Sequence, residues 1–170
     1  MSQLLYGSKA ATGYERGFAR ISSHFIPFLL KAAGVAAGHR VLDVASGTGL
    51  AAEAALAVVG ATGHVTATDI SPNMAEQARE RLKRASNATV QVEDGQAIGL
   101  PDNSIDALIC SLGLMFFPNP ARGLGEFRRV LRNRGRAAVS VNTVPKRSYN
   151  TRIHPLMARY VPSLAENAAR

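Results

Sequence analysis

The tight turn Ser46-Gly47-Thr48-Gly49 constrains the fold of this 170-residue chain more than any other feature. Residues 40–45, which precede the turn, read Arg-Val-Leu-Asp-Val-Ala and are typical of a short buried strand. Residues 50–59, which follow it, are rich in Ala and Leu and indicate a helix that ends at Gly60. A strand that passes through a glycine turn into a helix begins a β-α-β unit, and such units build parallel sheets.

The same alternation continues along the chain. Ser71-Pro72 predicts a helix start, with Ser as the N-cap and Pro in the first turn. Pro27 predicts a break between two short helices within residues 14–34. Further strands are predicted over residues 65–68, 89–92, 105–112 and 137–141, and further helices over residues 121–132 and 153–169. The predicted fold is a Rossmann-like three-layer α/β/α sandwich with a mainly parallel sheet and right-handed crossovers.

Ligands of such sheets bind beyond the carboxyl ends of the strands, where the strand order reverses. The segment Gly47-x-Gly49-x-x-Ala52 fits the loose dinucleotide-binding pattern, and Asp69 lies 20 positions after Gly49. A carboxylate at that place can accept both hydroxyls of an adenosine ribose. The turn alone leaves NAD and S-adenosylmethionine as alternatives.

Asp43 separates these two cofactors. It lies four residues before Gly47, where it would face the pyrophosphate of NAD. Two like charges a few Å apart in a partly dry cleft repel by several kcal/mol. The same carboxylate suits the ammonium and sulfonium of S-adenosylmethionine, so the residues favour that cofactor.

The motifs in order resemble those of class I methyltransferases. Residues 41–49 resemble motif I, and residues 68–74 resemble the second motif. Residues 93–96, 100–102 and 104–106 resemble the segment that spans strands three and four, and residues 126–131 resemble the helix before strand five. The subgroup that this chain resembles most is the methyltransferase type 11 and ubiquinone/menaquinone-biosynthesis-like set, over about residues 10–145. The resemblance implies an S-adenosylmethionine-dependent enzyme that methylates a small apolar or aromatic molecule.

The resemblance also implies site residues. The methionine part of the cofactor would lie at the glycine turn and the strand before it, on Asp43, Ala45, Ser46, Gly47, Thr48 and Gly49. The adenosine part would lie on Asp69, which binds the ribose, and on Ile70, Met74, Asp94, Gly95 and Gln96 around the adenine. Cys110 and Ser111 would lie near the sulfonium, although a lone Cys in an apolar stretch is ordinarily a small buried residue. No metal site is expected.

Three regions are expected. Residues 1–36 form a helical segment, residues 37–145 form the cofactor-binding domain, and residues 146–170 form a basic, helical C-terminal segment. The family continues to a sixth and a seventh strand, whereas no clear strand follows Val141. The predicted sheet is therefore short of seven strands, and its fifth strand would be an exposed edge. Either the chain is a fragment, or a second copy, a partner or the last segment covers that edge.

The catalytic residue is left open. Methyl transfer needs a base only where the acceptor must lose a proton, and the candidates are His24, Tyr14, Tyr6, His154 and Tyr149. Residues 112–117 either line an apolar acceptor pocket or pack into the core. The N-terminus does not resemble a signal peptide, and the longest apolar stretch, residues 107–117, is too short to span a membrane, so a cytoplasmic protein is expected.

The charge is uneven along the chain. Residues 1–120 hold nine Lys or Arg and ten Asp or Glu, whereas residues 121–170 hold eleven Lys or Arg and two Asp or Glu. Six arginines between Arg122 and Arg136 are compatible with an RNA-modifying enzyme. They lack interleaved aromatic residues, so a solvated helix face is favoured over nucleic acid. Two further alternatives stay open. The first is a degenerate cofactor-binding module without turnover, and the second, which ranks below it, is an NAD-dependent oxidoreductase.

Overall fold

The computed structural model of the protein describes residues 23–143. A helix covers residues 23–33. The elements that follow are β1 (Arg40–Val44), α2 (Leu50–Val59), β2 (His64–Asp69), α3 (Pro72–Leu82), β3 (Ala88–Val92), β4 (Ile105–Ser111), the 3₁₀ helix η1 (Leu114–Phe116), α4 (Pro120–Val130) and β5 (Leu131–Ser140). The chain divides into two compact units, Met1–Ser140 and Val141–Arg170, and all of these elements belong to the first.

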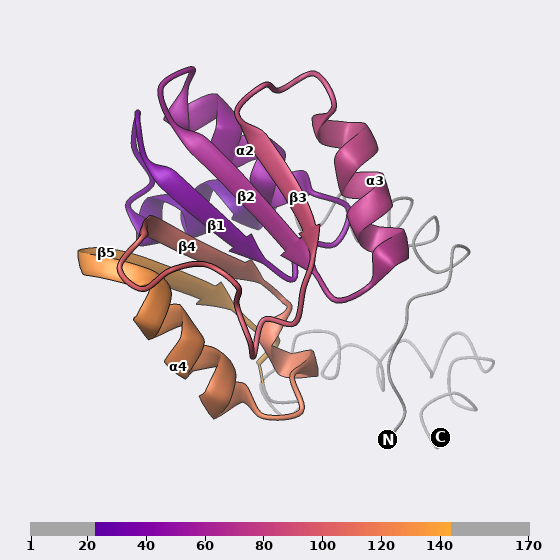
Figure 1. Ribbon diagram of the computed structural model, residues 1–170, viewed down its shortest axis with the longest axis vertical. Helices are drawn as coiled ribbons and strands as arrows, with labels where there is room; N and C mark the ends of the chain where they lie inside the picture. Colours follow the sequence, from indigo (N-terminus) through magenta and orange to yellow (C-terminus); the bar gives the residue numbers. More distant parts are fainter. Residues whose placement is uncertain (1–22, 144–170) are drawn as a thin grey trace, which may run out of the picture. The chain divides into compact units, whose positions relative to one another are not determined.

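The five strands form one parallel sheet in the order β3-β2-β1-β4-β5 (Figure 1). The chain moves outward from β1 through β2 to β3 and then returns to the other side of β1 with β4. The strand order therefore reverses between β1 and β4, which is where ligands of open parallel sheets bind. At this central position Asp43 of β1 is in register with Ala67 of β2 and Ile109 of β4. The topology confirms the predicted Rossmann-like class.

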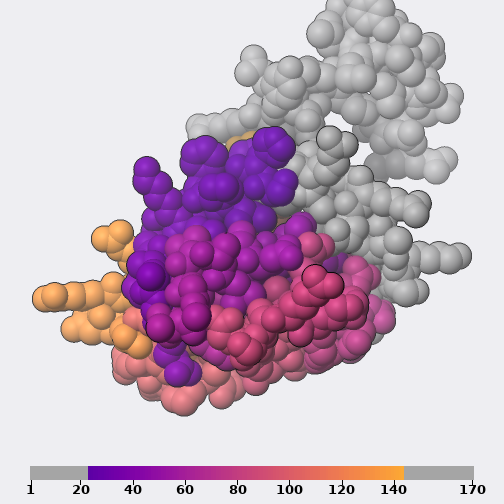
Figure 2. Space-filling model, turned by 90° about the horizontal axis from the view of Figure 1, so that it is seen from above, coloured from indigo at the N-terminus to yellow at the C-terminus, as the bar shows by residue number. Residues whose placement is uncertain are grey.

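Two hydrophobic clusters cover the two faces of the sheet. The first joins the helix over residues 23–33, α2 and the end of α3 to Val41 of β1 and to residues of the neighbouring strands. The second joins Phe127 of α4 and Ile98 of the preceding loop to Leu42 and Val44, which point to the opposite face. Because side chains alternate along a strand, one five-residue strand serves both clusters. Side chains of the first described helix also form part of the molecular surface (Figure 2).

The helix ends follow the local sequence. Ser71 caps α3 by accepting from the amide of Met74 at 3.5 Å, and Pro72 occupies the first turn. Asn119 and Pro120 begin α4 in the same way, with Asn119 Oδ1 accepting from the amide of Arg122 at 3.1 Å. A proline in the first turn lacks an N–H that would have no helical partner there, so these starts lose no hydrogen bond.

Two sequence predictions about the elements are wrong. The helix over residues 23–33 continues through Pro27, because Ile26, Leu29 and Leu30 bury one of its sides in the core. The fifth strand begins at Leu131 instead of residue 137, directly after α4. Its pairing with β4 then jumps from Ile105–Leu131 to Ala107–Arg136.

The segment Asn133-Arg134-Gly135 lies inside this irregularity, where Arg134 has a left-handed φ of 67°. The helix predicted over residues 153–169 lies outside the described residues. Within residues 23–143, no helix combines the length and the apolar character needed to cross a membrane.

A substitution at Gly113 tests how tightly the loop after β4 packs on the loop after β1. A Cβ atom at Gly113 would lie 2.4 Å from Cβ of Ala45 and 3.1 Å from Sγ of Cys110. We expect Gly113→Ala to lower the free energy of unfolding by about 1–3 kcal/mol in urea titrations, because neither neighbour is a flexible chain end. Gly125→Ala is the matched control, since Gly125 is helical and has no neighbour within 4 Å. It should stabilise by about 0.5–1 kcal/mol, and equal effects of the two substitutions would contradict the packing described.

Candidate functional site

The glycine turn leaves β1 at the reversal point of the sheet and leads into α2. Gly47 and Gly49 have left-handed φ angles of 56° and 82°, which side chains other than glycine rarely adopt. A Cβ atom at Gly47 would meet no atom of the described residues within 4 Å, whereas one at Gly49 would lie 3.1 Å from Cβ of Ala78. Gly47 therefore presents open backbone to a ligand, and Gly49 allows the turn to pack closely on α3.

Asp69, the last residue of β2, links the turn to α3. Its Oδ2 accepts from the amide of Gly47 and its Oδ1 accepts from the amide of Ser71, both at 2.8 Å. Burial raises the pKa of this carboxyl above its usual range, while the two amides oppose the rise. Each carboxylate oxygen has a second lone pair. Asp69 can therefore hold the turn and still accept the hydroxyls of a ribose.

Asp43, near the end of β1, is fully buried. Neither of its carboxylate oxygens has a hydrogen-bond partner within the described part of the chain. Burial raises its pKa from 3.8 to about 8, the negative charge of Asp69 contributes to the rise, and the nearby backbone amide of Ala52, too poorly aligned to count as a hydrogen bond, opposes it weakly. A buried carboxyl that lacks donors is costly to ionise, and a cation placed beside it would recover much of that cost.

The loop after β3 brings the third predicted acid toward the site. Oδ1 of Asp94 accepts from the backbone amide of Gln96 at 2.9 Å, an Asx turn. Oε1 of Gln96 accepts from the amide of Asn119 at 2.8 Å, so Gln96 ties this loop to the start of α4. Gly95 is packed, because a Cβ atom there would lie 2.5 Å from the ring of Phe117 and 2.6 Å from Val44. Gly95 and Gln96 thus hold the shape of the loop that presents Asp94.

Comparison with known proteins decides the family. A family model described as a methyltransferase domain matches residues 42–139. The chain belongs to this methyltransferase family. The demethylmenaquinone methyltransferase of Tropheryma whipplei (strain Twist) is 36% identical over 164 residues, 94% of this chain and 66% of that protein. The ubiquinone/menaquinone biosynthesis C-methyltransferase of Cupriavidus taiwanensis is 38% identical over 113 residues, 66% of this chain and 46% of that protein.

This methyltransferase chain therefore spans about half to two thirds of the length of these two curated relatives. An S-adenosylmethionine-dependent methyltransferase from Aquifex aeolicus superposes with a TM-score of 0.72 at 21% identity, over 94% of this chain and 88% of that one. At that identity the superposition shows the fold alone. Together, the family match and the fold confirm the predicted class I methyltransferase family and S-adenosylmethionine as its cofactor.

The remaining predicted cofactor contacts differ in exposure. Ile70 is 52% exposed beside Asp69, whereas Met74, in the first turn of α3, is 4% exposed. Cys110 is fully buried in the second hydrophobic cluster, and burial raises the pKa of its thiol to about 12. Its side chain therefore packs as a small apolar group. A ligand at this strand end would meet the partly exposed Ser111 rather than the thiol.

Within residues 112–117, the core-packing prediction holds for some side chains, while others are partly exposed. Phe117 packs edge-on against Phe127, with ring centroids 6.3 Å apart, and Leu114 packs against the same cluster. Met115 and Phe116 between them are 39% and 49% exposed. The segment is thus fixed by its ends and presents two large apolar side chains between them.

Three of the six arginines that suggested RNA have polar partners in the protein. Arg129 pairs with Glu126 and Asp102 at 2.7 Å and donates to two loop carbonyls, and Arg132 pairs with Asp106 at 2.6 Å. Arg122 donates to the carbonyl of Gln96 at 2.8 Å. Of the candidate bases, His24 lies exposed on the first described helix, and Tyr6, Tyr14, Tyr149 and His154 lie outside the described residues.

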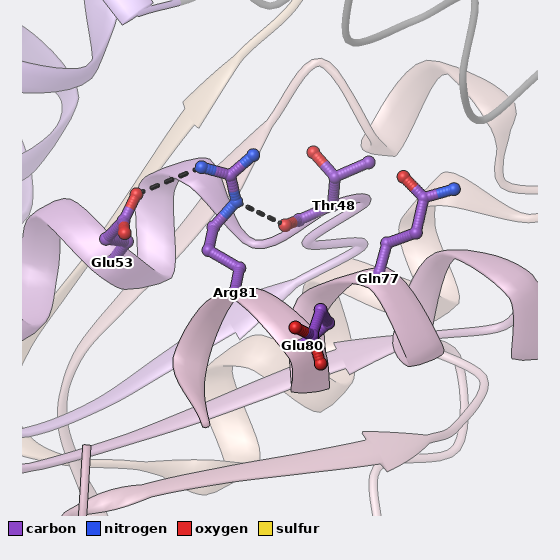
Figure 3. Close-up of a pocket in the computed structure, with 5 residues that line it drawn as sticks. All are labelled: Thr48, Glu53, Gln77, Glu80 and Arg81. Carbon is purple, nitrogen blue, oxygen red and sulfur yellow. Dashed lines mark hydrogen bonds and ion pairs between the residues drawn. The ribbon is translucent and has the colours of Figure 1, made fainter. Parts of the chain in front are cut away.

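Sequence reasoning missed Arg81 of α3, which contacts the glycine turn directly (Figure 3). Its partner in the turn, Thr48, is 33 positions away in the sequence, so no local pattern signals the contact. Arg81 looks like an ordinary basic residue in the last turn of a helix.

The buried Asp43 predicts how stability depends on pH. Its pKa is raised on folding, so the folded protein holds this proton more tightly than the unfolded chain does. The stability that this proton contributes is complete below about pH 4 and is lost as pH rises toward about 8. Urea titrations of the cofactor-free protein between pH 5 and pH 8 should show wild type losing stability with pH, by up to about 1 kcal/mol per pH unit, relative to Asp43→Asn. Parallel pH profiles of the two proteins would contradict the assignment, because Asp69 titrates in both.

Proposed function

We propose that this chain is the cofactor-binding part of an S-adenosylmethionine-dependent methyltransferase whose acceptor is a small apolar ring compound. The observation that carries the proposal is the pair of buried carboxylates, Asp43 and Asp69, on either side of the open backbone at Gly47. A cationic ligand with a ribose suits this arrangement. An anionic dinucleotide would place its phosphates against two acids.

The residues present fit the cofactor. Asp43 and the backbone of the glycine turn would hold the methionine part, Asp69 the ribose hydroxyls, and Ile70 and Asp94 the adenine. When bound, S-adenosylmethionine supplies an activated methyl group for transfer to a nucleophile. The walls around these contacts would be shaped by the other predicted site residues, which are Ala45, Ser46, Thr48, Met74, Gly95, Gln96 and Ser111.

The protein's own contribution would be alignment of the two reactants. Holding two reactants in line can supply about 7–11 kcal/mol of the barrier without any group that takes a proton. A rigid turn, fixed at Gly47 by Asp69 and packed at Gly49 on α3, suits that task. A base remains unassigned, and His24 is the candidate that lies within the described residues.

The acceptor proposal draws on the relatives and on the loop after β4. One curated relative is named a ubiquinone/menaquinone biosynthesis C-methyltransferase, and the other a demethylmenaquinone methyltransferase. Met115 and Phe116 present large, partly exposed apolar surface just beyond the carboxyl end of β4. Such side chains suit an apolar aromatic ring.

We also propose that the protein is cytoplasmic and that the outer edge of β5 is covered by further chain, a second copy or a partner. Among the described strands, β5 pairs only with β4.

Calorimetric titration with S-adenosylhomocysteine tests cofactor binding. We expect Asp69→Asn to weaken binding by about tenfold to hundredfold, because hydrogen bonds to a charged acceptor are each worth about 1.5–3 kcal/mol. Glu76→Gln is the matched control, since it removes a carboxylate from α3 that pairs only locally with Arg79. Folded wild-type protein that does not bind, or equal affinities of the two variants, would contradict the proposal.

Turnover tests the acceptor. S-Adenosylhomocysteine release should depend on a reduced, demethylated naphthoquinone added in detergent. The Phe116→Ala substitution should raise the KM for this naphthoquinone more than it changes kcat. Binding of the cofactor without turnover of any ring acceptor would instead favour a cofactor-binding module.

A further inference from the structure

A polar network joins α2, α3 and the glycine turn at a place that the predicted cofactor contacts do not include. Nε of Arg81 donates to the carbonyl oxygen of Thr48 at 2.8 Å, and one of its terminal nitrogens pairs with Glu53 of α2 at 3.1 Å (Figure 3). These side chains, with Gln77 and Glu80, line a hollow of about 400 Å³. The hollow is lined by none of the three cofactor acids Asp43, Asp69 and Asp94, so Arg81 reaches the turn from another side.

We infer that Arg81 is a positioning residue of the cofactor site, which fixes the peptide between Thr48 and Gly49 in the orientation that the cofactor requires. The inference rests on the proposed function, because it assigns a role within the same site. Arg81 would act through the turn and would not itself touch the cofactor.

The hydrogen bonds of this peptide carry the argument. Its carbonyl accepts from Arg81, and its N–H, that of Gly49, donates to the carbonyl of Ser46 at 3.0 Å. Because a peptide unit is planar, two bonds at its opposite ends fix the orientation of the plane. They thereby help to set the left-handed φ of 82° at Gly49.

The surroundings of Arg81 also favour a positioning role. Arg81 lies one turn after Ala78, the residue on which Gly49 packs, so one side of α3 supports the turn by both contact and charge. The side chain of Arg81 is 23% exposed, whereas that of Arg79, which pairs with Glu76 on the same helix, is 43% exposed. A partly buried, charge-assisted bond is stronger than an exposed ion pair.

The choice of arginine is explained by two of its acceptors, the Thr48 carbonyl and the Glu53 carboxylate. A guanidinium presents rigidly separated N–H groups, so it can serve the Thr48 carbonyl and the Glu53 carboxylate together. A lysine in its place would keep the charge but would have a single nitrogen for both. Substitution by lysine should therefore restore part of the function that methionine removes.

The test compares Arg81→Met, Arg81→Lys and the control Arg79→Met in full-length chain, by calorimetric titration with S-adenosylhomocysteine and by thermal melting. Methionine keeps the aliphatic stem near Gly49 but removes the polar contacts with Thr48 and Glu53. We expect about tenfold weaker binding in Arg81→Met, an intermediate value in Arg81→Lys and wild-type binding in Arg79→Met. In turnover assays the KM for S-adenosylmethionine should rise in the same order while the KM for the acceptor stays constant.

Several outcomes would overturn the inference. Folded Arg81→Met that binds within twofold of wild type would do so, and so would a loss of affinity equal to that of Arg79→Met. If Arg81→Met does not fold, Arg81→Lys decides, and wild-type affinity in that variant overturns the inference. Failure of wild type itself to bind would instead remove the proposed function on which the inference rests.

Discussion

The site depends most on the hydrogen bonds that the Asp69 carboxylate accepts. This carboxylate stands at the end of β2 and accepts from the amide of Gly47 on one side and from the amide of Ser71 on the other. One side chain thus joins the central loop of the sheet to the start of the neighbouring helix. The carbonyl of the same residue accepts from the amide of Glu93 at 3.0 Å, which ties in the loop that carries Asp94. This one residue therefore links the loops at the ends of the first three strands.

Around that link, the site combines a rigid backbone with a buried carboxyl group that is costly to ionise. Close packing at Gly49 and Gly113 leaves the backbone of the loops little freedom. Asp43 of β1 is fully buried, and neither of its carboxylate oxygens has a well-formed hydrogen bond among the described residues. Such a group lowers the stability of the cofactor-free protein at neutral pH. We regard this cost as part of the function, since strain and unpaired polar groups gather where a ligand will relieve them.

Much of the fold could be predicted because its determinants are local. The bounds of α2 were predicted to the residue, since glycines flank it, and Ser71-Pro72 defined the start of α3. Pro27 misled because burial of Ile26, Leu29 and Leu30 outweighs one missing hydrogen bond, and β5 begins early through pairing with β4 that no local pattern reveals. Tertiary contacts override local propensity in both cases.

The site divides in the same way. The spacing in the sequence predicted that four residues lie close together, namely Asp43, Gly47, Gly49 and Asp69. A strand, a turn and the end of the next strand fix where they meet. The packing roles of Gly95 and Cys110 depend on Phe117 and on the second cluster, which the sequence does not bring together. The contact of Arg81 with Thr48 depends on how α3 crosses the turn, and only the folded chain shows it.

The central claim is that the glycine turn and the acids around it form one cofactor site. An NMR titration of ¹⁵N-labelled protein with S-adenosylmethionine tests it most directly, because glycine amides are well separated in such spectra. The account predicts that the amides of Gly47, Gly49 and Gly95 shift together along one saturable curve while Gly125 of α4 stays in place. Saturable shifts confined to α4, or no shift in a folded protein, would contradict it.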